Sequence, residues 1–190
     1  MSRYGPVELL IPQHDRSTFD CGSVDQTTWL QRYALQAQQA DTARVYVACR
    51  AGETRVVGYY ALAGGAVQSQ AATDRLAAGA GRQPIPVVIL ARLGVDVAEQ
   101  GHGLGTALVR DALLQAVAVA TKIGVRAVLI HAESAEAAQF YTRLDPAFEH
   151  SPTDPLHLLM LMKDIRVGIK KAARQVATLG EPDKPTVSGG

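Results

Sequence analysis

The feature that most constrains this chain is a strand that runs directly into a glycine-rich turn and then into an apolar helix. Residues 87–97 are rich in valine, isoleucine and leucine, the turn reads Gln100-Gly-His-Gly-Leu-Gly105, and residues 106–122 are apolar on nearly every side. Such a turn leaves backbone N–H groups unpaired at the N-terminus of the helix, where the helix dipole adds about half a positive charge. The segment therefore predicts an anion site, usually one for phosphate.

The glycine spacing excludes two common phosphate ligands. The dinucleotide fingerprint G-x-G-x-x-G fails, because its third glycine would fall on Thr106 or Leu108, and no acidic residue follows at the expected distance. The nucleotide P-loop fails because the turn contains no lysine. By elimination, the turn suits a pyrophosphate that is held without a metal or a lysine.

Strands and helices are predicted on both sides of this turn. The strands are expected at residues 7–11, 44–50, 55–63, 125–131 and 156–162, and the helices at residues 25–39 and 134–144. Gly64-Gly65 ends the hairpin or marks a bulge, and residues 73–78 form one or two helical turns in an otherwise irregular stretch. This order predicts an α/β (α+β) fold around one central sheet.

Composition limits the classes of function. Of 190 residues 47% are hydrophobic, enough for a real core, and the formal net charge of +1 argues against a polybasic nucleic-acid binder. Cys21 and Cys49 form neither a metal quartet nor a disulfide framework, so no metal is expected and the protein is expected in the cytoplasm. No apolar run is long enough to span a membrane or act as a secretory signal.

Two organisational units are predicted. Residues 1–166 form the folded domain, and residues 167–190 form a basic and then Pro/Gly/Ser-rich flexible tail. From Lys163 onward the chain holds six Lys or Arg against three Asp or Glu, so the body carries −2 and the terminal segment +3. The basic segment is either a solvated charge run or a surface that contacts a partner or nucleic acid.

The motif Gln100-x-x-Gly103-x-Gly105 resembles the pyrophosphate motif of the GNAT superfamily of acetyltransferases. Residues 89–97 resemble its splayed central strand, and Ser134-x-x-Ala137-x-x-Phe140-Tyr141 is similar to its N-x-x-A-x-x-F-Y helix. The resemblance implies a GNAT fold: one mixed, largely antiparallel sheet that is splayed at the acetyl-CoA site, with helices on both faces. It implies that acetyl-CoA is held by Leu93, Val95, Gln100, Gly101, His102, Gly103, Gly105, Thr106 and Ser134.

A narrower resemblance covers roughly residues 5–166 and leaves the rest of the chain unaccounted for. Phe19-Asp-Cys-Gly22, Trp29-Leu30, residues 86–93 and Ser151-Pro-Thr-Asp-Pro155 are similar to the acetyltransferase toxins of bacterial type II toxin–antitoxin modules. That resemblance implies acetylation of the α-amine of charged tRNA, which stalls translation, a ribbon-helix-helix antitoxin as partner, and a homodimer. One departure is that no Gly-Phe pair follows Tyr141.

The predicted chemistry is transfer from a thioester to an amine. An α-amine has a pKa of about 7.7–8.0, and an aminoacyl ester lowers it further, so a useful fraction is neutral without a strong base. Backbone N–H groups near Leu93 and Val95 stabilise the oxyanion, and Tyr141 is the candidate general acid for the departing thiolate. Arg82 and Arg92 are the candidates for contacting tRNA phosphates, with ordinary surface arginines as the alternative.

Several interpretations stay open at this point. The acceptor is a charged tRNA in the first, and a protein N-terminus, a lysine or a small-molecule amine in the second. The third is a non-catalytic module that binds acetyl-CoA or a partner. His102 is either a solvent-facing turn residue or a phosphate contact, while Cys21 and His131 are expected to be packed rather than catalytic.

Overall fold

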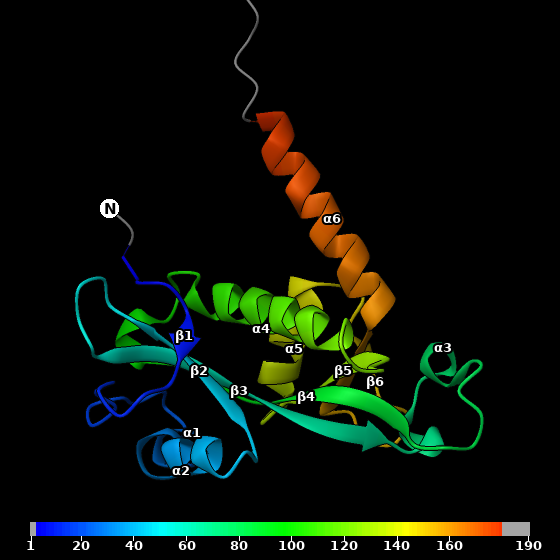
Figure 1. Ribbon diagram of the computed structural model, residues 1–190, viewed down its shortest axis with the longest axis horizontal. Coiled ribbons are helices and arrows are strands. Elements are labelled where there is room, and N and C mark those ends of the chain that lie inside the picture. The colour runs from blue at the N-terminus through cyan, green and yellow to red at the C-terminus, as the bar shows by residue number, and fades with distance from the viewer. Residues whose placement is uncertain (1–2, 180–190) are drawn as a thin grey trace, which may run out of the picture.

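The protein folds around one seven-stranded mixed sheet, as the computed structural model of residues 3–179 shows (Figure 1). The strand order is β1-β2-β3-β4-β5-β7-β6, and every neighbouring pair is antiparallel except β4 and β5. The expected mixed, largely antiparallel sheet is thus confirmed. The strands are β1 (Glu8–Leu9), β2 (Arg44–Cys49), β3 (Val56–Val67), β4 (Ile85–Val95), β5 (Ala127–His131), β6 (Glu149–His150) and β7 (His157–Leu161).

Most helices begin at a residue whose side chain or backbone suits a helix start. The hydroxyls of Ser23, Thr73 and Ser134 accept hydrogen bonds from the first turns of the helices that they cap, and Gly103 starts α4 with a left-handed backbone. The helices are α1 (Val24–Thr28), α2 (Ala34–Gln39), α3 (Asp74–Ala77), α4 (Leu104–Ala120), α5 (Ala135–Leu144) and α6 (Met162–Leu179). A π-helical stretch, Trp29–Tyr33, joins α1 to α2, so the predicted helix at residues 25–39 is one helical segment with an irregular centre.

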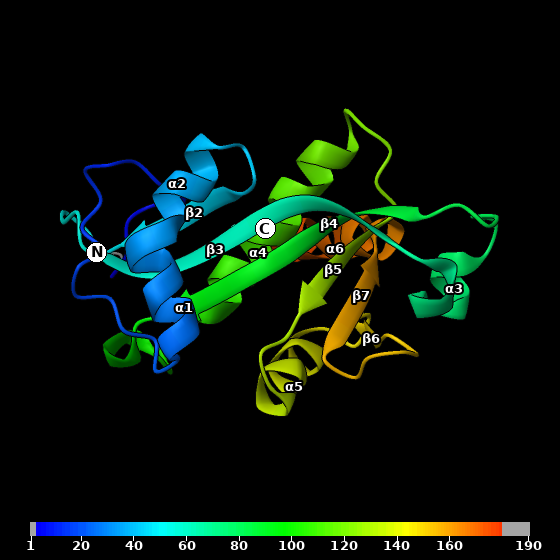
Figure 2. The same cartoon turned by 90° about the horizontal axis from the view of Figure 1, so that it is seen from below.

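Helices cover both faces of the sheet, as expected (Figures 1 and 2). On one face α4, α5 and α6 enclose a core that includes Leu108, Ala138 and Ile165. On the other face the segment from α1 to α2 buries Leu30 and Ala34 against β2 and β3, and α3 buries Leu76 against the far ends of β3, β4, β5 and β7. The sheet is therefore buried on both sides over most of its length.

Three details differ from the sequence prediction. The Gly64-Gly65 pair neither ends β3 nor forms its bulge, since β3 continues to Val67 and its register shifts between Ala61 and Leu62. The short strand β6 was not predicted, because two residues carry too little pattern to be recognised. The predicted boundary at residue 166 lies inside α6, which runs to Leu179.

Helix α6 exists beyond that boundary because its sequence keeps one apolar side. Met162 and Ile165 are buried in the core, and Ile169 packs against it from the next turn. Residues 167–179 therefore continue a helix where a flexible basic tail was expected, while the Pro/Gly/Ser-rich residues 180–190 lie outside the described residues. Among the described residues, no helix combines the length and apolar character that a membrane span requires.

Candidate active site

The sheet opens between β4 and β5, and a bulge in β4 marks where the opening starts. The two strands pair in parallel only from Val87 to Leu90 on β4. On its other edge β4 pairs Leu90 with Leu62 and Arg92 with Ala61, so Ala91 is an extra residue in the ladder. Bulges increase the local twist of a strand. Beyond the bulge β4 leaves β5, and the two diverge in a V (Figure 2).

The opening exposes backbone groups of the residues that the sequence singled out. Asp96 donates its N–H to Val57 on β3 (2.9 Å), and successive residues of a strand point their N–H groups in opposite directions. The N–H groups of Leu93 and Val95 therefore point away from β3 into the gap beside β5. Two N–H donors on the same edge of the strand, both pointing into the gap, can bind the carbonyl groups of an amide-containing ligand and stabilise a developing oxyanion.

The glycine turn lies at the same end of β4. Gly101 and Gly103 both have left-handed backbones, with φ of +77° and +81°, a conformation that favours glycine. No acidic side chain lies in the first turn of α4, and the first N–H to bond within the helix is that of Ala107, to Gly103. The preceding N–H groups are thus available to an anion, as the sequence predicts.

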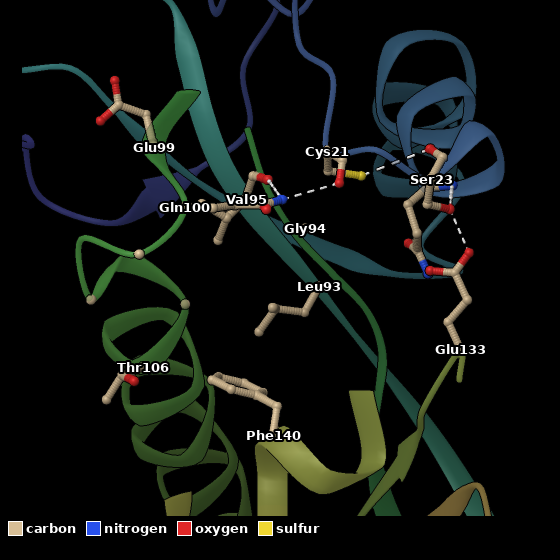
Figure 3. Close-up of a pocket in the computed structure, with 14 residues that line it drawn as sticks. Cys21, Ser23, Leu93, Gly94, Val95, Glu99, Gln100, Thr106, Glu133 and Phe140 are labelled. Carbon is tan, nitrogen blue, oxygen red and sulfur yellow. Dashed lines mark hydrogen bonds between the residues drawn. The ribbon is translucent and has the colours of Figure 1, made fainter. Parts of the chain in front are cut away.

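Gln100 braces this turn rather than pointing into open space. Its side-chain amide donates to the backbone oxygens of Val95 (3.1 Å) and Cys21 (3.2 Å), so it ties the end of β4 to the N-terminal loop (Figure 3). The acceptor at Val95 is the carbonyl that points into the gap. Gln100 therefore fixes the relative position of the splayed strand and the glycine turn.

A cavity of about 480 Å³ joins the gap to the turn. Leu93, Val95, Gln100, Gly101, Gly103, Gly105 and Thr106 line it, so the structure brings seven of the nine predicted cofactor residues together. The wall also includes residues that were not predicted to bind: Cys21, Ser23, Gln26, Gly94, Glu99, Glu133 and Phe140. Cys21 is partly buried: it packs against the core beside α1 and β3, as expected, and it also lines the cavity.

The other two predicted cofactor residues lie outside this wall. His102 is exposed at the tip of the turn. Ser134 caps α5, where its hydroxyl accepts from the N–H of Ala137 (3.2 Å), and it borders a neighbouring depression shared with residues 22–25. The hydroxyl therefore has a structural role, and its contact with the cofactor stays a prediction.

Tyr141, the predicted general acid, lies behind the cavity wall. Its neighbour Phe140 faces the cavity, whereas the Tyr141 side chain is 6% exposed and belongs to the core shared with α4. Its ring packs edge-on against Phe140 and Phe148, with centroids 5.2 and 6.0 Å away, and no described residue accepts a hydrogen bond from its hydroxyl. Burial raises the pKa of Tyr141, so the phenol stays protonated at neutral pH and keeps a proton to donate.

The two predicted tRNA-contacting arginines occupy very different places. Arg92 lies on the splayed part of β4, with its guanidinium 4.9 Å from the centre of the Trp29 ring and 3.5 Å from the Gln26 side-chain oxygen, on the α1 face of the sheet. Arg82 is exposed in the loop before β4. This loop lies at the opposite end of the strand from Val95, and ten residue steps of extended chain make the strand about 30 Å long. The structure thus brings only Arg92 to the candidate site.

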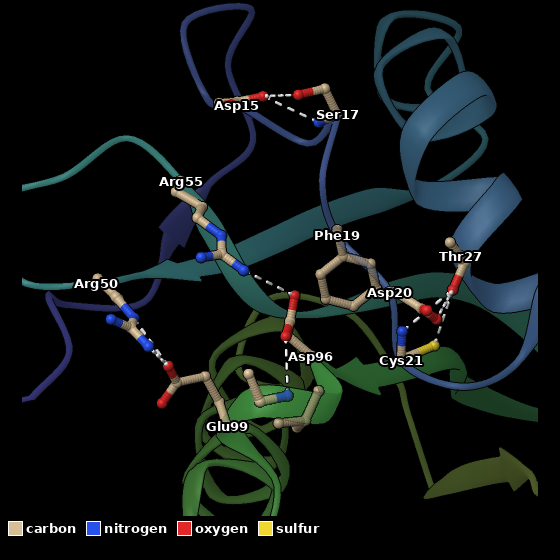
Figure 4. Close-up of polar contacts among 12 residues, drawn as sticks. Asp15, Ser17, Phe19, Asp20, Cys21, Thr27, Arg50, Arg55, Asp96 and Glu99 are labelled. Atoms are coloured by element: carbon tan, nitrogen blue, oxygen red, sulfur yellow. Dashed lines mark hydrogen bonds and ion pairs between the residues drawn. The ribbon is translucent and has the colours of Figure 1, made fainter.

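Glu99 is a buried carboxylate directly before the turn (Figure 4). Its side chain is 1% exposed and accepts hydrogen bonds from Arg50, from Arg3 (3.0 Å) and from Tyr4 (3.0 Å). Burial alone would raise the pKa of Glu99, but the hydrogen bonds from Arg50 and Tyr4 and the charge of Arg3 outweigh it and lower the pKa. Glu99 is therefore an anionic anchor for the chain around the turn, and not a general base.

Replacing Glu99 by glutamine tests this anchor. We expect a loss of about 1–3 kcal/mol in the free energy of unfolding at pH 7, because hydrogen bonds to a charged group are lost. A carboxyl whose pKa is lowered by folding stabilises the fold at any pH above its pKa in the unfolded chain, about 4.3. This contribution disappears as the pH falls through the lowered pKa of the folded protein. Urea unfolding at pH 7 and at pH 3 should show a large difference from wild type at the first pH and a small one at the second. An equal difference at both would contradict an ionised Glu99.

Replacing Gly103 by alanine tests the backbone of the turn. A side chain in a left-handed conformation costs about 1–2 kcal/mol, although nothing lies within 4 Å of the added carbon. We expect this strain to distort the turn and to raise the KM for acetyl-CoA about tenfold, equivalent to about 1.4 kcal/mol. Gly52→Ala is the matched control, because Gly52 has the same backbone (φ +80°) and equally empty surroundings in a turn that does not line the cavity. A similar rise in both variants would contradict a role of Gly103 in cofactor binding.

The splayed strand, the glycine turn and the cavity between them define an acyl-CoA-dependent transferase of the GNAT fold. No family model matches the sequence. The sequence is 44% identical over 166 residues to a tRNA-acetylating toxin of Mycobacterium tuberculosis, a similarity that covers 87% of this chain and 97% of that protein. The chain belongs to this family of acetyltransferase toxins.

Solved structures of another toxin, AtaT, share the fold. AtaT complexed with acetyl-methionyl-tRNAfMet superposes with a TM-score of 0.79 at 25% identity, over 86% of this chain and 98% of that chain. A tyrosine-to-phenylalanine mutant of AtaT bound to the C-terminus of the antitoxin AtaR and to acetyl-CoA gives a TM-score of 0.73 at 24% identity, over 87% and 97% of the two chains. The GNAT fold expected from the sequence is thus confirmed.

Proposed function

We propose that this protein uses acetyl-CoA to acetylate the α-amino group of the aminoacyl end of charged tRNA, and thereby blocks translation. The observation that carries the proposal is the gap between β4 and β5, where two backbone N–H groups point into a cavity that the glycine turn also lines. The family relationship to a tRNA-acetylating toxin supports the acceptor. AtaT, which shares the fold, has been solved with an acetylated aminoacyl-tRNA.

The cofactor fits the residues that line the cavity. The N-terminus of α4 and the glycine turn would hold the pyrophosphate, and the backbone of Leu93 and Val95 would hold the pantetheine and the thioester. The side chains of Leu93 and Phe140 give this stretch an apolar wall (Figure 3). When bound, acetyl-CoA supplies the activated acetyl group. Among the described residues, no group of three or more His, Cys, Asp or Glu side chains gathers as a metal site would require.

The reaction needs no strong base in this cavity. Of its two carboxylates, Glu99 is held by arginines, and Glu133 is exposed to solvent and accepts a hydrogen bond from Ser23. A useful fraction of an aminoacyl α-amine is neutral near pH 7–8, whereas a lysine with a pKa of about 10.4 is almost fully protonated there. As the neutral amine displaces the thiolate from the thioester carbonyl, Tyr141 would give its proton to the sulfur, and the proton released by the amine nitrogen would restore the phenol, so that an amide and a free thiol are the products. The cavity therefore favours an α-amine over a lysine as acceptor.

A charged tRNA acceptor also needs cations near the gap. Arg92 is the described arginine best placed for this, because it lies on the splayed part of β4 next to Gln26 and Trp29. It would contact the 3′ end of the tRNA on the face of the sheet covered by α1. This assignment extends the sequence-based prediction for Arg92. Arg82 lies beyond the other end of β4, so it would contact a different part of the tRNA.

The partners and location follow the family. A small antitoxin of the ribbon-helix-helix type would hold the toxin inactive, since AtaT was solved with the C-terminus of its antitoxin. We also propose a homodimer in the cytoplasm, to be checked by light scattering on the purified protein. Both proposals rest on the family relationship.

Expression in a bacterium without the antitoxin tests the toxin activity. We expect growth arrest on induction, and rescue of growth when Tyr141 is replaced by phenylalanine. A transferase for a harmless small amine should not arrest growth. Arrest that persists in the Tyr141→Phe protein would point to binding instead of catalysis and would contradict the proposal.

A further inference from the structure

Helix α6 carries a cationic ridge on the side that faces away from the protein core. Residues 163–175 contain five cations and one acid. At about 100° per residue, the cations fall within about 140° of the helix circumference, and all of them are exposed. We call this set the α6 ridge; it consists of Lys163, Arg166, Lys170, Lys171 and Arg174.

The packing of α6 fixes the direction in which the ridge points. Ile165 is buried on the opposite side of the helix, and Gly168, Ile169 and Ala172 border a groove against α4. The α4 side of that groove is formed by Val109, Arg110, Leu113 and Leu114. Because this apolar side is held against α4, the cations are presented to solvent by a helix that projects from the body (Figure 1).

No carboxylate of α6 offsets the ridge. The one acid of its described part, Asp164, accepts a hydrogen bond from Arg75 (2.7 Å), which also pairs with Glu149 on β6. That network ties the start of α6 to α3 and uses the negative charge of Asp164 there. The rest of the chain before Lys163 carries a net charge of −2. Positive charge is thus concentrated on one projecting surface of an otherwise weakly acidic protein.

The ridge lies close enough to the active site to act on the same macromolecule. Helix α6 meets α4 between Val109 and Leu114, about 9–16 Å along the α4 axis from Gly103 at the phosphate-binding turn. From Lys163 to Arg174 the ridge extends for about 16 Å, long enough for several successive phosphates of a nucleic-acid strand. A small acceptor that fits the cavity cannot reach it.

We propose that the α6 ridge binds the phosphate backbone of the tRNA whose aminoacyl end enters the gap between β4 and β5. The proposal rests on the proposed function, because it assigns a docking surface to the same substrate. A row of exposed cations without base-reading geometry suits sequence-independent phosphate contacts, which dominate the affinity of nucleic-acid complexes. The ridge would therefore raise the affinity for tRNA in general and leave the choice of amino acid to the cavity.

The test compares two acceptors with a triple variant. Lys163, Lys170 and Lys171 are replaced together by glutamine in the full-length protein, and kcat/KM is measured with full-length charged tRNA and with an aminoacylated 3′-terminal trinucleotide. We expect a loss of about tenfold or more for the full tRNA and no change for the trinucleotide. In a plot of log(kcat/KM) against log[salt], the magnitude of the slope for the full tRNA should fall by about 2–3, as the loss of three phosphate contacts predicts.

Three controls keep the outcome interpretable. The same three lysines replaced by arginine keep the charge and should retain the wild-type slope, while Lys122→Gln removes an exposed cation outside the ridge and should change little. Circular dichroism and the unfolding midpoint verify that the glutamine variant is folded. Binding of uncharged tRNA, followed by fluorescence anisotropy, tests the ridge independently of catalysis.

Other outcomes would overturn the proposal. An unchanged salt slope, or an equal loss on the trinucleotide, would exclude a phosphate-binding role. Normal tRNA kinetics together with weaker inhibition by the antitoxin would make the ridge a protein-docking surface. If the wild type acetylates neither acceptor, the proposed function fails. In that case, equal binding of uncharged tRNA by the wild type and the glutamine variant would separately exclude the α6 ridge as a tRNA-binding surface.

Discussion

Tyr141→Phe should lower the rate of acetyl transfer by about 10²–10⁴ while leaving the fold intact. The substitution removes one oxygen from a ring that packs between Phe140 and Phe148 on α5 and in the turn after it. No described residue accepts a hydrogen bond from that hydroxyl, so little stability should be lost. In the wild type the raised pKa keeps the Tyr141 phenol protonated, so that it can protonate the departing thiolate. The rate should fall in the variant because phenylalanine has no proton to donate. Single-turnover kinetics with acetyl-CoA and charged tRNA measure the step directly.

A second tyrosine provides the matched control for this experiment. Tyr46 is half-buried on β2 and stacks on Tyr60 with ring centroids 4.9 Å apart, and it does not line the cavity. Tyr46→Phe removes the same atom from the same protein and should leave the rate within about twofold of wild type. A near-normal rate for Tyr141→Phe would end the assignment of Tyr141 as general acid, and an equal loss in both variants would indicate a general effect on the fold.

Gly94→Val should combine a loss of stability with a large loss of activity. Gly94 lies between the two residues whose N–H groups enter the gap, and a β-carbon there would meet Tyr59 Cε1 at 2.9 Å and Cys21 Sγ at 3.3 Å. Tyr59 cannot move aside easily, because it is fully buried, packs against Phe19 and donates its hydroxyl to Gln26. Overpacking of this kind costs about 1–3 kcal/mol.

The loss of activity follows from where the strain is relieved. If Tyr59 holds its place, β4 must shift, and misplacement of reacting groups by about 1 Å can cost about 10²-fold in rate. Gly64→Val is the control, since Gly64 is exposed on β3 and has no atom within 4 Å of an added β-carbon. Urea unfolding and kcat/KM should both change for Gly94→Val and hardly change for Gly64→Val. Normal kcat/KM in a folded Gly94→Val protein would contradict the role of this strand.

The sequence predicted the strand, glycine turn and helix of the candidate site because their signals are local. Three successive segments form this part of the site: the strand at residues 85–95, the turn from Gln100 to Gly105 and the helix that follows. The left-handed positions in the turn are occupied by glycine, which can be recognised in the sequence. Hydrophobic periodicity likewise indicated most of the strands, and Ser134 indicated the start of α5. These features need no knowledge of which segments meet in space.

The rest of the cavity depends on contacts between distant segments. Cys21, Ser23 and Gln26 reach the wall only because the N-terminal segment crosses the end of β4, where Gln100 holds it by a hydrogen bond. The bulge at Ala91 carries no side-chain signal, and the adjacent glycines at 64 and 65 suggested a bulge in the wrong place. The anchor around Glu99 joins residues about 50 and 95 positions apart, so no local sequence pattern indicates that this carboxylate is buried and paired.

Helix α6 shows how packing can override composition. Its many cations suggested a solvated tail, yet Met162, Ile165 and Ile169 recur at helical spacing and are held against the core. The same packing turns a dispersed run of positive charge into a one-sided ridge. Near-neutral overall charge is thus compatible with a local cationic surface on a helix that packs against α4.

One measurement tests the proposed acetylation of charged tRNA most directly. The purified protein is incubated with acetyl-CoA and bulk charged tRNA, and the aminoacyl ends are released and analysed by mass spectrometry. We expect a gain of one acetyl group on the α-amine of one or more aminoacyl species, dependent on acetyl-CoA and strongly reduced with the Tyr141→Phe protein. Acetyl-CoA consumption without any acetylated aminoacyl end, or acetylation confined to protein or free amines, would contradict the proposed function.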